Sequence, residues 1–143
     1  MRLSSTMRPL LFLLALSTAN ADWPTYLHDA SRVGATQEDL KLPLQPAWNF
    51  ESPTAPKMAW AGEDGRVIEG HELFNRIRFD DVFHVAISEG NVFFGSSVDG
   101  RVICRDLATG ADKWSFFTNA PVRLAPTVVD GKVFVGSDDG YAY

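Results

Sequence analysis

An internal repeat is the feature that most restricts the fold of this chain of 143 residues. Residues 86–96 (AISEGNVFFGS) align with residues 127–137 (TVVDGKVFVGS) at an offset of 41 positions. An Asp-Gly pair follows each copy, at Asp99-Gly100 and at Asp139-Gly140, where the offset is 40. The alignment therefore predicts two copies of one structural unit. The identical positions are Gly90, Val92, Phe93, Gly95 and Ser96 in the first copy and Gly131, Val133, Phe134, Gly136 and Ser137 in the second.

The length of the repeat indicates the kind of unit. A period near 40 residues with strand patterning is typical of a β-propeller blade of four strands, whereas helical repeats of similar length show a 3.6-residue periodicity. The sequence predicts an all-β fold: a partial β-propeller of about two four-stranded blades with an irregular N-terminal extension. Turn signals place the strands at 82–88, 92–94, 101–104 and about 113–117 in the first unit, and at 123–129, 132–137 and from 141 onward in the second.

The connection between the third and fourth predicted strands carries the most specific motif, DLATGADKW at residues 106–114. An aspartate such as Asp106 accepts backbone N–H groups across a turn, and Gly110 suits a left-handed backbone position. The large ring of Trp114 is expected to lie flat against the next blade and seal the gap between the two. The sequence thus predicts structural roles for these residues.

This pattern, Asp-x-x-Thr-Gly-x-x-x-Trp, resembles the tryptophan-docking motif of the pyrroloquinoline-quinone (PQQ)-type propeller repeat, on Asp106, Thr109, Gly110 and Trp114. Cys104 stands where that motif often has alanine, and Ala111 where it often has lysine. The resemblance covers about residues 83–143. It implies membership of an exported superfamily that includes quinoprotein dehydrogenases, outer-membrane assembly factors and many non-enzymatic binding propellers.

The N-terminal region is also similar to the opening of exported propellers of this superfamily, through Trp23-Pro24 and the segment Pro46–Phe50. In such propellers a strand near the N-terminus often completes the last blade and closes the ring. The resemblance implies that Ala47–Glu51 is a candidate for this closing strand.

Residues 1–21 have the pattern of a secretory signal peptide. A basic start precedes a short apolar run at 10–16, and Ala19-Asn20-Ala21 is a small-x-small cleavage site. The apolar run is far shorter than the roughly 20 residues of a membrane-spanning helix, so no transmembrane anchor is predicted. The sequence predicts export to the periplasm or the extracellular space. The formal net charge of −5 argues against nucleic acid as a partner.

We divide the remainder into residues 22–51, the N-terminal extension with the candidate ring-closing strand; 52–81, an irregular insertion; 82–121, the first blade; and 122–143, a truncated second blade. Within the insertion, Arg66–Glu69 and Arg76–Phe79 alternate polar with apolar residues and are expected to form a hairpin. A closed ring of 4 to 8 blades takes on the order of 160 to 320 residues at this period, so the chain is expected to be an N-terminal fragment.

Candidate binding residues lie on the predicted inner strand and in the insertion. His84 is expected on the innermost strand, where it could face a central channel that holds a ligand, although a satisfied structural histidine is favoured. His71 and its acidic neighbours Glu69 and Glu72, with His84 further on, could hold a metal, but they lack a fixed helical spacing, and a solvated loop is favoured. Arg76 and Arg78 are expected in a surface ion-pair cluster or a ligand site.

Two function classes remain. The favoured one is an exported, non-catalytic propeller that acts as a scaffold in the cell envelope and binds a protein or small ligand on its face. The alternative is the N-terminal part of a PQQ-dependent quinoprotein dehydrogenase that oxidises an alcohol or sugar, in which the cofactor carries the chemistry. No catalytic residue, metal ligand or cofactor is assignable. PQQ with calcium would need further blades to supply its site.

Overall fold

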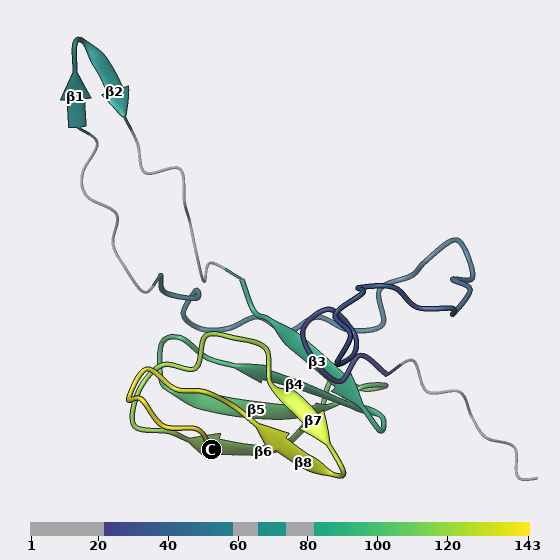
Figure 1. Cartoon of the computed structure of the whole chain (residues 1–143). Helices are drawn as coiled ribbons and strands as arrows, with labels where there is room; N and C mark the ends of the chain where they lie inside the picture. Colours follow the sequence, from purple (N-terminus) through teal and green to yellow (C-terminus); the bar gives the residue numbers. More distant parts are fainter. Residues whose placement is uncertain (1–21, 59–65, 74–81) are drawn as a thin grey trace, which may run out of the picture.

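In a computed structural model, the described residues, 22–58, 66–73 and 82–143, are all-β, without a helix. Three sheets account for their strands (Figure 1). One sheet has four strands and the other two have two strands each. The all-β prediction is confirmed for this part of the chain. The predicted signal peptide lies outside the described residues, and no described helix is long and apolar enough to cross a membrane.

The four-stranded sheet is an antiparallel meander in the order β3-β4-β5-β6. Its strands lie close to the predicted positions, but β3 begins three residues later than expected, at Val85 instead of Val82. Gly90, at φ 72°, makes the tight turn from β3 to β4 in a conformation that costs glycine little. The strands are β3 Val85–Ser88, β4 Asn91–Gly95, β5 Arg101–Asp106 and β6 Asp112–Phe117.

The second copy of the repeat forms a smaller antiparallel unit. β7 (Thr127–Val129) pairs with β8 (Lys132–Phe134), and both are shorter than predicted. Beyond β8, Val135 and Tyr143 exchange backbone hydrogen bonds of 3.0 and 2.9 Å. The chain therefore folds back beside β8, as the predicted third strand from residue 141 requires, with a single bridge in place of a strand.

The two faces of the four-stranded sheet are covered by different parts of the chain. Cross-strand register places Ala86, Phe93, Cys104 and Trp114 in one row. This face, which we call face A, packs against Val128 and Val133 of the second unit. The opposite face, face B, carries Val92, Phe94 and Ile103, and it packs against Trp48, Phe50 and Phe83. The core thus lies on both sides of one meander.

The N-terminal segment joins the two units along the edge formed by β3 and β7. Trp23 and Ile87 exchange backbone hydrogen bonds of 2.7 and 2.8 Å, so Trp23 extends the sheet beyond β3. Pro24 O accepts from Val128 N at 2.8 Å, and the Thr25 hydroxyl lies 2.8 Å from that of Thr127. Ala47–Glu51, the candidate closing strand, forms no strand in the described structure and instead packs through its aromatic side chains on face B. Its role in closing a ring stays a prediction.

The hairpin described in the insertion has its second strand closer to the first than was expected. β1 (Arg66–Ile68) pairs with β2 (His71–Leu73). Glu69 and Gly70 take positive φ of 53° and 81°, which closes a two-residue turn directly after β1. Local turn geometry therefore replaces the longer connection that was expected. Residues 76–79 lie outside the described residues.

Candidate functional site

The turn after β5 has the hydrogen bonds of a compact aspartate-centred turn. Asp106 Oδ1 accepts from Ala108 N at 3.1 Å, from Thr109 N at 2.9 Å and from Thr109 Oγ1 at 2.9 Å. These bonds from Thr109, with the nearby Lys113 ammonium, hold the pKa of Asp106 below its ordinary value. Gly110 lies at φ 71°, a left-handed position that glycine adopts readily. Asp106, Thr109 and Gly110 therefore order this turn.

Trp48 lies against this turn. Its indole Nε1 donates to Leu107 O at 2.8 Å. A Cβ placed on Gly110 would lie 2.6 Å from the Trp48 ring, so the ring needs a glycine beneath it. The other side of the turn is held by Arg105, whose Nη1 donates to Gly110 O at 2.6 Å and whose guanidinium lies 4.2 Å from the centre of the Phe50 ring.

The sequence analysis missed the contact of Trp48 with the turn, although a signal was present. Trp48-Asn49-Phe50 shares its Trp-x-Phe pattern with Trp114-Ser115-Phe116. The pattern thus occurs once in the segment that packs on face B and once on β6, the edge strand of the sheet.

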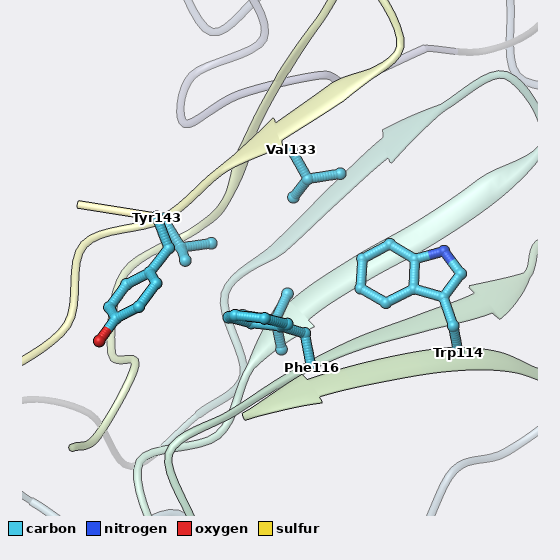
Figure 2. Close-up of a pocket in the computed structure, with 6 residues that line it drawn as sticks. Trp114, Phe116, Val133 and Tyr143 are labelled. Atoms are coloured by element: carbon cyan, nitrogen blue, oxygen red, sulfur yellow. The ribbon is translucent and has the colours of Figure 1, made fainter. Parts of the chain in front are cut away.

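Trp114 lies at an open hollow between the two units, which we call the apolar groove (Figure 2). The ring centre lies 5.9 Å from that of Phe93, and 43% of the residue is exposed. The flat seal against the next unit that was expected of Trp114 is therefore incomplete here, since the second unit leaves a space of about 230 Å³ beside the ring. The lining residues are Val102, Trp114, Phe116, Val133, Val135 and Tyr143.

Tyr143 contributes a hydroxyl group to the rim of the apolar groove. Figure 2 shows its hydroxyl directed away from Trp114 and Phe116. That hydroxyl donates to Asp139 Oδ2 at 2.7 Å, and the bond raises the pKa of Tyr143 above its ordinary value of 10.0. Its ring centre lies 5.8 Å from that of Phe116. A mainly apolar lining with a polar group at its rim suits binding by burial of apolar or aromatic surface.

Of the other candidate residues that the structure describes, none lines this groove. His84 is half-buried and directly precedes β3, and His71 is exposed on β2. Arg76 and Arg78 lie outside the described residues. Cys104 is buried at 1% exposure, and burial raises the pKa of its thiol. Among the described residues, no three His, Cys, Asp or Glu side chains come together as a metal site.

Comparisons with known proteins give no family for this chain. No protein-family model matches it, and no curated protein sequence matches it.

Proposed function

We propose that this chain belongs to an exported, non-catalytic β-propeller with PQQ-type repeats, which acts as a binding scaffold for a protein or small ligand in the cell envelope. The observation that carries the proposal is the meander β3–β6 followed by a second copy of its first strands. β7 and β8 repeat β3 and β4 at the 41-residue offset and pack on face A of the first unit. Face-to-face packing of successive four-stranded meanders is how propeller blades build a ring.

The turn between β5 and β6 adds a second observation in support. A tryptophan from another segment, Trp48, covers the Asp-x-x-Thr-Gly turn and bonds to its Leu107 carbonyl. A second tryptophan in the same local pattern, Trp114, borders the apolar groove beside the second unit. Such rings act as apolar contacts between packed units.

Export and scaffold function are tested together in cells. The chain with its own leader is expressed in a bacterium, and the N-terminus of the protein from the periplasmic fraction is sequenced. The proposal expects Asp22 as the first residue. A photo-cross-linking residue at Phe117, which is 63% exposed, should form a discrete adduct, and one at Lys132, which is exposed on β8 and does not line the apolar groove, should form none. Retention of the uncleaved chain in the cytoplasm would refute the proposed export.

The dehydrogenase alternative predicts a different result on the same protein. Addition of PQQ and calcium would then give alcohol- or sugar-dependent reduction of a dye, whereas the scaffold gives none above a control without protein. Turnover in this assay would replace the scaffold proposal with the enzyme.

A further inference from the structure

Asp-Gly pairs recur at the turns of this chain, and three of them lie among the described residues, at Asp99-Gly100, Asp130-Gly131 and Asp139-Gly140. An Asp-Gly bond is chemically labile, because glycine has no side chain to keep its backbone nitrogen away from the aspartate carboxyl group. The first two pairs have almost the same local sequence, Val-Asp-Gly followed by arginine or lysine. A difference between their reactivities is therefore expected to come from the fold.

The pair Asp130-Gly131 is open to solvent. It forms the two-residue turn between β7 and β8, at the tip of their hairpin (Figure 1). Both residues are exposed, and a Cβ on Gly131 would meet nothing within 4 Å. In the described structure, neither the Asp130 carboxylate nor the Gly131 nitrogen has a hydrogen-bond or ion-pair partner. The two groups that would react are therefore adjacent, hydrated and not held by other contacts.

The pair Asp99-Gly100 is held by its surroundings. The Asp99 carboxylate pairs with Arg101 at 3.0 Å. Gly100 is buried, and a Cβ on it would lie 2.6 Å from Ala120 O. Its carbonyl oxygen accepts from Thr118 N at 2.7 Å and from Thr118 Oγ1 at 2.8 Å. The backbone of this turn therefore has little freedom to bring its nitrogen onto the carboxyl carbon.

The pair Asp139-Gly140 is held by hydrogen bonds on both reacting groups. The Asp139 carboxylate accepts from Tyr141 N at 2.9 Å and from the Tyr143 hydroxyl at 2.7 Å. Gly140 N donates to Ser137 O at 3.0 Å. These bonds must break before the nitrogen can attack the carboxyl group, so the reaction is expected to be slow at this turn.

The first unit contains the equivalent turn without the reactive pair. Glu89 and Gly90 have φ of 50° and 72° between β3 and β4, and Asp130 and Gly131 have φ of 50° and 68°. Attack by the glycine nitrogen closes a five-membered ring on aspartate but a less favourable six-membered ring on glutamate. A difference of one CH2 group therefore confines this chemistry to the second of the two equivalent turns.

We propose that Asp130-Gly131 is a site of spontaneous isoaspartate formation in the folded chain, and that the other two described pairs resist it. The Gly131 nitrogen bonds to Cγ of the protonated Asp130 carboxyl group, and its proton leaves with the carboxyl hydroxyl group as water. Water then opens the resulting cyclic imide. Cleavage of the Cγ–N bond restores aspartate, and cleavage of the bond between the nitrogen and the main-chain carbonyl carbon leaves isoaspartate. One water is lost and one is regained, so the reaction needs no further reactant.

Isoaspartate would loosen the second unit, because its main chain runs through Cβ and Cγ and is one atom longer. β7 and β8 pair at three positions, and the pair beside the turn is Val129 with Lys132. A longer turn disturbs this pair first. Val128 and Val133 on the same strands pack on face A, so the contact between the two units weakens as well. The inference concerns the chemistry of this turn and does not depend on the proposed scaffold function.

The test follows isoaspartate in the full chain, kept folded at mildly acidic pH. Trypsin places the three pairs in separate peptides, residues 79–101, 124–132 and 133–143. An isoaspartyl methyltransferase with labelled S-adenosylmethionine then marks the isoaspartate in each peptide. We expect peptide 124–132 to gain label about tenfold faster than the other two, or more, because several contacts must break before those pairs react.

Two controls separate the fold from the local sequence. The same incubation in denaturant should give similar rates for peptides 79–101 and 124–132, because their Asp-Gly pairs have similar neighbours. Asp130→Glu copies the turn of the first unit and should abolish the label in peptide 124–132, whereas Asp99→Glu should leave that label unchanged. An unchanged denaturation midpoint for each variant shows that it is folded.

Three results overturn the inference: equal rates for peptides 79–101 and 124–132 in the folded chain, the same preference for peptide 124–132 in denaturant, or label retained in that peptide of Asp130→Glu. The first would show that the fold does not protect Asp99, the second that the preference lies in the local sequence, and the third that Asp130 is not the reacting residue. None of them alters the N-terminal sequencing or cross-linking results, so failure here is distinct from failure of the proposed function.

Discussion

Phe93 and Phe134 occupy the same position in the two copies of the repeat, yet Phe93 is 6% exposed and Phe134 is 51% exposed. The glycines two positions later differ in the same way. A Cβ on Gly95 would lie 2.7 Å from the backbone oxygen of Val122, whereas a Cβ on Gly136 would meet nothing within 4 Å. Among the described residues, the first unit is covered on both faces, whereas the second packs against face A and the N-terminal segment. Burial is therefore set by the neighbours of a unit and not by its own sequence.

The largest expected effect tests this comparison directly. Phe93→Ala should lower the free energy of unfolding by about 3–5 kcal/mol, as for other buried aromatic truncations, because its ring packs on Ala86, Cys104 and Val128. Phe134→Ala should cost about 1 kcal/mol or less, because half of that residue is already exposed. Urea denaturation followed by circular dichroism measures both. Equal losses would mean that the second unit is covered in solution.

The paired glycines give the next largest effect. Gly95→Ala should destabilise the chain by about 1–3 kcal/mol, since the new methyl group meets the backbone of Val122, which cannot turn aside as a side chain can. Gly136→Ala should stay within about 0.5 kcal/mol of the wild type. The same denaturation curves report both values. A cost for Gly136→Ala as large as that for Gly95→Ala would contradict the open space seen around Gly136.

The two tryptophans extend the comparison from the sheets to the turn. Trp48→Phe keeps a ring over Gly110 but loses the bond to Leu107 O, and it should cost about 1 kcal/mol. Trp114→Phe, the matched change at the apolar groove, should cost less, because that ring is 43% exposed. Thermal unfolding followed by tryptophan fluorescence separates the two, since each variant retains the other ring. A larger loss for Trp114→Phe would reverse the assignment of the covered and open sites.

The smallest effect concerns pH. Bonds from Thr109, with Lys113 nearby, hold the folded-state pKa of Asp106 below the 3.8 of an unperturbed aspartate. A carboxyl group with a lowered folded pKa stabilises the protein above the unfolded value and loses that contribution as pH falls through the folded pKa. Asp106→Asn should therefore be less stable than the wild type at neutral pH and should lose less stability below pH 3.8. Parallel midpoint-against-pH curves for the two proteins would show that the turn does not depend on this charge.

Most of the meander was predictable because its signals are local. β4, β5 and β6 begin within one residue of the predicted positions, since β-branched and aromatic runs end at glycine turns whose geometry depends on a few adjacent residues. The partner of β1 was not predicted, although its signal, a two-residue turn at Glu69-Gly70, is also local. Residues 76–79 alternate polar with apolar residues and His71–Leu73 does not, yet His71–Leu73 pairs with Arg66–Ile68 across a two-residue turn. Alternation alone does not choose between partners.

The sequence by itself determined the all-β class, the strand spacing of the two units and the glycine turn at Asp106, because alternation and turn chemistry act over a few neighbouring residues. The tertiary structure decided what those elements meet. It places the Trp48 indole against the carbonyl of Leu107, 59 positions away, and pairs Trp23 with Ile87. It also buries Phe93 while the equivalent residue of the second copy, Phe134, stays exposed. Each of these depends on segments distant in the chain, whose approach is driven by the total apolar surface they bury.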